Sequence, residues 1–214
     1  MKAAACHNIQ IDEQVASQLN VSRETIDKLA EYLATLGKWQ AKINLISAKT
    51  LPDAWRRHIL DSAQLAPFLP LTPSHILDIG SGAGFPGLVL SIVTPHRVTL
   101  VESDQRKAIF LRTVIRELNL TAEVINERIE TVAPVGASIV TARALAPVEK
   151  LLFWLDQQLP SVEKCLFLKG ASVREELTAL ESYPNIDHRI FPSVSSTDGA
   201  VLELDTSKHH GMEF

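Results

Sequence analysis

The sequence predicts an α/β fold: a doubly wound, mostly parallel sheet with an N-terminal helical cap and a C-terminal antiparallel strand pair. Three observations support this. From residue 75 onward, short apolar runs typical of strands covered on both faces alternate with helical patterns. The segment before residue 70 shows helical spacing alone, and the last part of the chain carries two strand-like runs around a turn cluster.

The helical cap is expected over residues 1–73. Ser22 is a suitable N-cap for a helix that begins at Arg23, and Gly37 is expected to end or kink that helix. Pro52 is expected to open a second helix. Because prolines recur between residues 67 and 73, we place the boundary to the main body, residues 74–214, at the end of that stretch.

The main body is expected to consist of alternating strands and helices. Strands are predicted at 76–79, 98–101, 123–126, 138–141 and 165–169, and helices at 87–93, 105–118, 148–159 and 173–180. The runs 189–194 and 201–205 flank the turn cluster 195–199 and are expected to close the sheet as an antiparallel pair.

Composition narrows the class of protein. The 214 residues are 46% hydrophobic and carry a net charge of −4, so a sizeable core is expected and a polyanionic partner would need a local basic face. Cys6 and Cys165 indicate no structural disulfide and fit a reducing compartment. No signal peptide and no membrane-spanning run is recognisable, so a cytoplasmic location is expected.

The glycine-rich bend after the first predicted strand is the most informative segment. Residues 78–87 read Asp-Ile-Gly-Ser-Gly-Ala-Gly-Phe-Pro-Gly, in which the glycines permit a tight turn close to a ligand and Pro86 suits the start of a helix. Glu102 ends the next strand, at about the twenty-residue offset where a carboxylate binds ribose hydroxyls. These features predict a site for a cofactor that contains a nucleoside.

The identity of that cofactor is open from spacing alone. Residues 82–87 also match the dinucleotide pattern G-x-G-x-x-G, which leaves a nicotinamide cofactor possible. Asp78 would be an awkward neighbour for a pyrophosphate, and a helical segment precedes the strand, so S-adenosylmethionine is favoured. The loop 126–130 is expected either to hold the adenine or to be a helix turn with Glu130 in solvent.

Several ordered motifs resemble one family, the RsmG (GidB) guanine-N7 methyltransferases of bacterial small-subunit ribosomal RNA. The resemblance extends from about residue 39 to residue 204. The segments that carry it are Asn-Leu at 44–45, His-Ile-Leu-Asp-Ser at 58–62, the bend 78–87 with its Phe-Pro-Gly ending, Thr-Ala-Arg-Ala at 141–144 and Leu-Lys-Gly at 168–170.

The resemblance implies a class I, Rossmann-like methyltransferase that uses S-adenosylmethionine. Its substrate would be 16S ribosomal RNA or the small ribosomal subunit, methylated at N7 of guanine 527 in the 530 loop. The implied cofactor contacts are Gly80, Phe85, Ile129, Glu130 and Arg143. Gly82 of the same bend is expected to join them, and Glu102 would bind the ribose. Because N7 carries an in-plane lone pair and no proton, no catalytic base is predicted.

Substrate contacts are expected from His58 and Lys169, with alternatives. Arg143 and Lys169 both end predicted central strands, where each would face the ligand or pair with a carboxylate at the sheet edge. His58 and Asp61 lie three residues apart on one helix face and would either help to recognise RNA or form a surface pair.

Three further expectations concern function class and partners. The cysteines and histidines, including the pair at 209–210, lack metal-ligand spacing, so no metal is expected, and a monomer is the default. Besides a methyltransferase, the sequence leaves open a nicotinamide-dependent oxidoreductase and a non-catalytic RNA-binding assembly factor.

Overall fold

The computed structural model describes residues 9–158 and 161–208. Cys6, the histidine pair at 209–210 and the predicted helix end at residue 159 therefore lie outside the described residues. Before the sheet, the elements are α1 (Glu13–Gln18), α2 (Arg23–Gln40), η1 (Leu51–Asp53), η2 (Trp55–Leu60), α3 (Asp61–Ala63) and η3 (Ala66–Phe68). From the first strand onward, they are β1 (His75–Ile79), α4 (Gly87–Val93), β2 (Arg97–Val101), α5 (Gln105–Leu118), β3 (Ala122–Ile125), η4 (Ile129–Thr131), β4 (Ile139–Arg143), α6 (Val148–Gln158), β5 (Lys164–Lys169), α7 (Val173–Glu176), η5 (Leu177–Ser182), β6 (Asp187–Pro192) and β7 (Ala200–Asp205).

The described strands form one sheet in the order β3-β2-β1-β4-β5-β7-β6, which confirms the predicted fold class. The first five pair in parallel, whereas β7 is antiparallel to both β5 and β6. Strand order reverses at β1, which has β2 on one side and β4 on the other. In such sheets a ligand binds beyond the carboxyl ends of the strands at this switch point.

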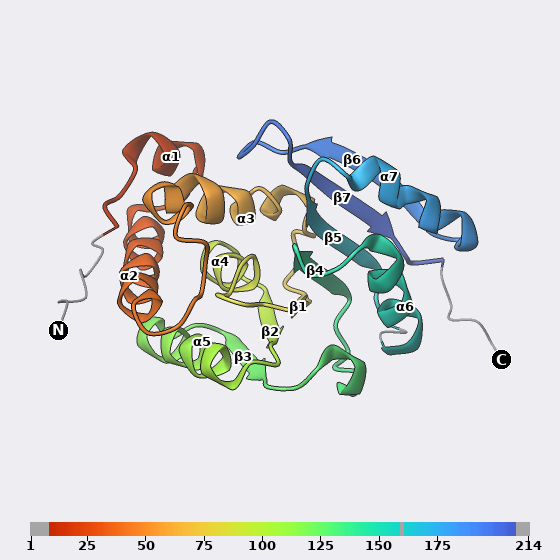
Figure 1. Ribbon diagram of the computed structural model, residues 1–214, viewed down its shortest axis with the longest axis horizontal. Helices are drawn as coiled ribbons and strands as arrows, with labels where there is room; N and C mark the ends of the chain where they lie inside the picture. The colour runs from red at the N-terminus through yellow and green to blue at the C-terminus, as the bar shows by residue number, and fades with distance from the viewer. Residues whose placement is uncertain (1–8, 159–160, 209–214) are drawn as a thin grey trace.

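Side chains from the strands alternate between two buried clusters, so the molecule has three layers (Figure 1). On β1, Ile76 joins the cluster under α2, α4 and α5, whereas Leu77 joins the cluster under α6, α7 and η5. Because both faces are covered, the strands read as continuous apolar runs, as the sequence indicated.

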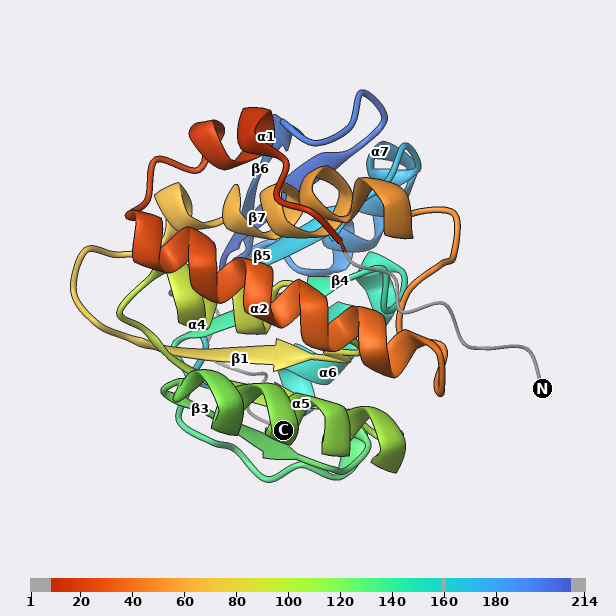
Figure 2. The ribbon, with the colours of Figure 1, turned by 90° about the vertical axis from the view of Figure 1, so that its left-hand side faces the viewer.

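The N-terminal helices belong to the first of these layers. Figure 2 shows α2 crossing the face of the molecule over α4 and α5, and it contacts both helices. Leu29 and Leu33 of α2 share one buried cluster with Phe110 of α5 and Ile76 of β1. The division of the chain at residue 73 stays a prediction, and the apolar core is continuous across it.

Three predictions about the helices differ from the structure. Gly37 does not end α2, which continues to Gln40, and Gly37 lies on its buried face. Burial of that face outweighs the roughly 1 kcal/mol that a helical glycine costs. The segment after Pro52 is not one α-helix: a short 3-10 turn leads into the π-helical η2, which buries His58, Ile59 and Leu60 in succession. The predicted helix 173–180 divides into α7 and the 3-10 segment η5.

All seven described strands begin or end one or two residues from the predicted bounds. Among the described helices, none is both long and apolar enough to cross a membrane.

Candidate active site

Two adjoining hollows open at the carboxyl edge of the parallel strands. The larger has a volume of about 810 Å³ and the smaller about 330 Å³. Gly80, Gly82 and Leu145 line both, so the hollows meet where β1 ends beside β4. All the residues predicted to bind cofactor or substrate line one hollow or the other: Phe85, Arg143, His58 and Lys169 the larger, Glu102, Ile129 and Glu130 the smaller.

The glycine bend forms the wall between the hollows. Gly82 has a φ of +58°, and a Cβ placed on it would meet only the carbonyl oxygen of Gly80, at 3.8 Å, so the space beside Gly82 is free of side chains. At Gly80, by contrast, a Cβ would lie 2.4 Å from the side chain of Leu145, which packs against the bend there. Gly84 serves packing instead, because a Cβ there would clash with Leu88 and with the hydroxyl of Tyr32. That hydroxyl donates to the carbonyl of Ala83 and thereby ties α2 to the bend.

Glu102 is fixed in the smaller hollow by the backbone around it. One carboxylate oxygen accepts the amide of Gly82 at 2.8 Å, and the other accepts the amide of Asp104 at 2.7 Å. The side chain of Asn126 donates to the carbonyl of Glu102 at 2.7 Å, which joins the ends of β2 and β3. Each carboxylate oxygen has a further lone pair, so the group remains able to accept hydroxyl donors.

Ile129 and Glu130 belong to η4, at the opposite wall of the smaller hollow. Ile129 is buried in the second cluster, and Glu130 is half-buried beside Arg128 at 3.7 Å. The structure thus gives the loop after β3 a short helical turn, with Glu130 paired rather than simply solvated.

Asp78 lies beneath the bend rather than in either hollow. It is 1% exposed, and its carboxylate accepts the hydroxyl of Thr141 at 2.8 Å, which links β1 to β4. Its other oxygen packs against Gly87, where a Cβ would lie only 2.8 Å away. Burial raises the pKa of Asp78 to about 6. Asp78 therefore orients the bend and does not face a ligand.

His58, Phe85 and Arg143 form a compact stack at the base of the larger hollow. The rings of His58 and Phe85 stack with centroids 4.9 Å apart, and the guanidinium carbon of Arg143 lies 4.9 Å from the Phe85 centroid. Phe85 is 3% exposed, so its ring is covered by these neighbours. The stack combines apolar burial with a cation–π contact.

Arg143 fixes the protonation state of His58. Its Nη1 donates to Nδ1 of His58 at 2.9 Å and to the carbonyl of Arg57 at 3.1 Å, and lies 3.5 Å from Asp61. Because a guanidinium only donates, Nδ1 must be unprotonated, and Nε2 donates to Thr50 at 2.9 Å. Burial, with help from Arg143 and Arg57, lowers the pKa of His58 to about 3. His58 is therefore neutral, and Arg143 rather than Asp61 is its partner.

Lys169 is also ion-paired. Its Nζ lies 2.7 Å from the carboxylate of Glu176 and donates to the carbonyl of Ala146 at 2.8 Å, and its side chain is 7% exposed. Arg143 and Lys169, the two cations at strand ends, are therefore each paired with a carboxylate, as one of the two alternatives from the sequence had it. Contact of His58, Arg143 or Lys169 with a ligand stays a prediction.

Sequence patterns did not identify several residues that shape the site. Tyr32 and Leu145 were not singled out, and Leu145 carries no chemical signal. Ser195 belongs to the turn cluster before β7, yet its hydroxyl donates to Asp61 at 2.5 Å. These residues come from three distant segments, so local spacing held no information about them. Among the described residues, no group of three metal-binding side chains is present.

Comparisons with known proteins place the chain in one family. The family model described as "GidB: rRNA small subunit methyltransferase G" matches residues 25–201. The chain is 49% identical to the ribosomal RNA small subunit methyltransferase G of Paramagnetospirillum magneticum, over 90% of this chain and 94% of the relative. It is 42% identical to the protein of that name from Cereibacter sphaeroides, over 93% and 99%.

Solved structures of lower identity share the fold. A SAM-dependent methyltransferase from Aquifex aeolicus superposes with a TM-score of 0.57 at 17% identity, covering 77% of this chain and 100% of that one. The 23S rRNA methyltransferase ErmE gives a TM-score of 0.52 at 19% identity, covering 75% and 68%.

Proposed function

The chain belongs to the rRNA small subunit methyltransferase G family, and from that premise we propose that it methylates N7 of a guanine in 16S ribosomal RNA with S-adenosylmethionine. By resemblance, the target is guanine 527 of the 530 loop. The observation that carries the proposal is the pair of hollows that meet at a glycine bend, with space free of side chains beside Gly82 and with a carboxylate fixed in one of the hollows.

The smaller hollow fits the adenosine part of the cofactor. Glu102 is placed to accept the ribose hydroxyls, and η4 with Ile129 and Glu130 offers backbone and apolar surface beside a purine. The bend at Gly82 would pass beneath the sulfonium, because a Cβ placed on Gly82 would have only the carbonyl oxygen of Gly80 within 4 Å, at 3.8 Å. When bound, S-adenosylmethionine supplies an electrophilic methyl group.

The larger hollow fits the target base. The N7 lone pair lies in the plane of guanine, so the protein needs to align it with the methyl group and exclude water, which lowers the barrier by several kcal/mol. No proton has to be removed from N7. A neutral, buried His58 and an ion-paired Lys169 are consistent with alignment rather than base catalysis.

Positioning of the base would depend on the stack of His58, Phe85 and Arg143. Arg143 is held by three partners, so its charge is fixed in place before substrate enters. Preorganised charge of this kind is more effective than a mobile side chain, because no reorganisation is needed at the moment of reaction. We include Arg143, His58 and Lys169 in the proposal as residues that shape the target pocket.

RNA would approach over the cap side of the larger hollow. Arg57 is exposed and lines it, Lys49 is exposed nearby in sequence, and together they give a local basic edge on an acidic protein. Affinity that depends on such phosphate contacts should fall as salt rises. The proposed substrate is 16S RNA or the small ribosomal subunit. The proposed enzyme acts as a monomer in the cytoplasm.

The test combines cofactor binding with methyl transfer. S-adenosylhomocysteine should bind tightly and NAD should not, and tritium from labelled S-adenosylmethionine should enter small-subunit RNA. Mass-spectrometric mapping should then place 7-methylguanosine at one position, absent from cells that lack the protein. Unchanged guanine methylation in those cells would rule out the proposed reaction, and binding without transfer would favour a non-catalytic assembly factor.

A further inference from the structure

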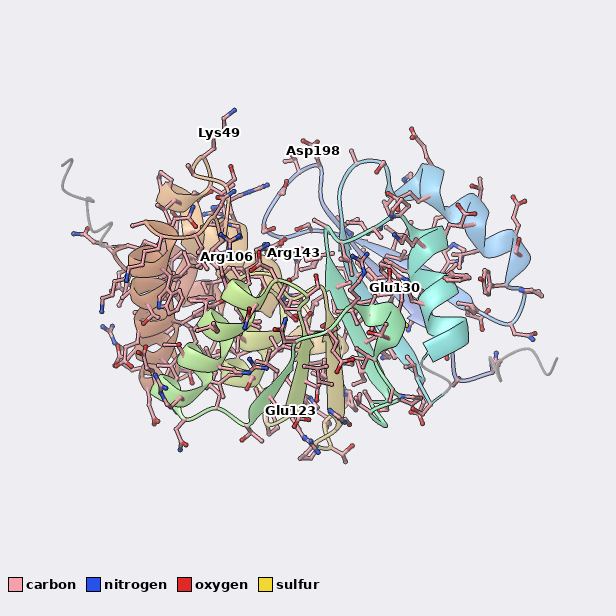
Figure 3. All side chains as sticks on the ribbon, turned by 60° about the horizontal axis from the view of Figure 1, so that its bottom comes forward. Lys49, Arg106, Glu123, Glu130, Arg143 and Asp198 are labelled. Carbon is pink, nitrogen blue, oxygen red and sulfur yellow. The ribbon has the colours of Figure 1, made fainter. Side chains whose placement is uncertain are left out.

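The loop between β6 and β7 brings an acidic side chain to the mouth of the larger hollow. Asp198 is exposed and lines the hollow together with Ser196 and Gly199. The amide of Gly199 donates to the carbonyl of Ser196 at 3.3 Å, so Asp198 sits within a tight turn at the tip of the loop. Figure 3 shows Asp198 and Lys49 at the same end of the molecule, with Arg143 deeper between them.

Asp198 differs from the two other carboxylates that line this hollow. Asp61 pairs with Arg143 and accepts a hydrogen bond from Ser195. Glu176 pairs with Lys169 and accepts a hydrogen bond from the amide of Val148. Asp198 has no hydrogen-bond or ion-pair partner within residues 9–158 and 161–208. Its oxygens are therefore free to accept donors from a molecule that enters the hollow.

The loop that carries Asp198 is anchored to the cap. The amide of Val194 donates to the side chain of Gln64 at 2.9 Å, and the buried hydroxyl of Ser195 donates to Asp61 at 2.5 Å. Asp61 in turn pairs with Arg143 at the base of the hollow. The position of the turn is thus coupled to the residues beneath the target base.

A carboxylate at this place is unfavourable for an RNA-binding protein unless it makes a specific contact, because it repels phosphates. Guanine offers such a contact. Its N7 lies on one edge, and the N1 hydrogen and the 2-amino group are two donors on the opposite edge, which face away from the methyl donor when N7 faces it. A carboxylate accepts both donors at once, whereas adenine presents an acceptor at N1.

We propose that Asp198 reads the Watson–Crick edge of the target guanine and makes the enzyme specific for guanine. The inference rests on the proposed function, since it presumes that a base enters the larger hollow with N7 toward the bend. Asp198 is a specificity-determining residue in this account. Ser195 and Asp61 are positioning residues, because they act by holding its loop.

The experiment compares guanine with inosine, which lacks the 2-amino group. Small subunits are reconstituted from 16S RNA ligated to carry either base at the position mapped above, and kcat/KM is measured by tritium transfer. Wild type should prefer guanine by about tenfold, within the range for one base-edge contact. In Asp198→Asn, kcat/KM on guanine should fall by about tenfold or more, and the guanine-to-inosine ratio should approach one.

Two variants control for charge and for geometry. Glu31→Gln removes an exposed carboxylate from α2, far from both hollows in sequence and lining neither, and should keep the wild-type ratio. Asp198→Glu keeps the acceptor pair and should retain part of the preference for guanine. Affinity for S-adenosylhomocysteine should be unchanged in all three variants, which shows that they fold.

The outcomes separate this inference from the proposed function. If Asp198→Asn keeps the wild-type ratio, or raises kcat/KM on both RNAs as loss of a merely repelling charge would, the inference is overturned. If wild type itself transfers no methyl group to the guanine-containing subunits, the proposed function fails instead.

Discussion

The two hollows are built in different ways. The smaller is lined mainly by the segments that follow β1, β2 and β3, between residues 80 and 130, each at a strand's carboxyl end. The larger gathers residues from the cap, from the ends of β4 and β5, and from the β6–β7 loop, between residues 45 and 199. The first follows from the rule that parallel strands end at one edge. The second depends on how distant segments pack.

The hollows also differ in how their charged groups are held. In the smaller, Glu102 is fixed by two backbone amides, that of Gly82 in the bend after β1 and that of Asp104 before α5. In the larger, Arg143 of β4, His58 of η2 and Asp61 of α3 hold one another across three elements. Backbone amides keep their places when a side chain is substituted, whereas a network of side chains is disrupted when one member is removed.

The largest effect should come from filling the junction between the hollows. Gly82→Val places a β-branched side chain at a φ of +58° and into the space left for a ligand. Strain of about 1–2 kcal/mol and the steric block together should lower affinity for S-adenosylhomocysteine by more than about a hundredfold, measured by calorimetry.

Gly136 provides a matched control for that change. It has a φ of +69°, and a Cβ placed on it would meet no atom within 4 Å, so Gly136→Val imposes the same backbone strain outside both hollows. It should destabilise the protein comparably and leave affinity intact. Equal loss of affinity in the two variants would show that strain, rather than the free junction, is what matters.

The next effect concerns His58 in the larger hollow, whose protonation should make the stability of the protein depend on pH. The pKa of His58 falls from the ordinary 6.5 to about 3, so the unfolded chain takes up this proton before the folded protein does. The stability this provides is full above pH 6.5 and is lost as pH falls toward 3. Between pH 6.5 and 4.5 the loss is about 2 kcal/mol.

Asp78 has the opposite effect in an overlapping range. Its raised pKa of about 6 means that its contribution to stability is full below pH 3.8 and is lost as pH rises through 6.

Because the neutral form of His58 is what acid removes, a protein without His58 should lose less stability on acidification. The measurement is urea denaturation of wild type and His58→Asn at pH 7.5, 6 and 4.5. Parallel pH curves would contradict the assignment of a neutral, buried His58.

A smaller effect is expected in the smaller hollow. Glu102→Gln keeps one acceptor for the amides of Gly82 and Asp104 but replaces the other with a donor. Affinity for S-adenosylhomocysteine should fall by roughly tenfold, as for loss of one hydrogen bond to a charged group. Glu127→Gln removes a carboxylate that lines the same hollow without those backbone contacts, and should change affinity by less than about twofold.

The smallest effect should come from the contact between the cap and the bend. Tyr32→Phe removes the hydroxyl that donates to the carbonyl of Ala83 and leaves a buried acceptor unpaired. The free energy of unfolding should fall by about 1 kcal/mol, measured by urea denaturation. Cofactor affinity should fall with it, because the bend loses its tie to α2. Unchanged stability would mean that water replaces the hydroxyl at no cost.

The sequence by itself determined the alternation of strands and helices, the closing antiparallel pair, and the placement of Gly82 and Glu102 at one edge. These depend on periodicity and on short spacings, which act within a few residues. It did not predict that α2 would continue through Gly37 or that η2 would be π-helical, because burial against the sheet overrides local preference there.

Only the tertiary structure decided which charges meet. From the sequence, Arg143 and Lys169 were cations at strand ends, and His58 and Asp61 were neighbours on one helix. Packing of η2 against β4 instead placed Arg143 between them, and the β6–β7 loop brought Ser195 onto Asp61. Such partners lie tens of residues apart, and their energies depend on distance and burial, which no linear pattern contains.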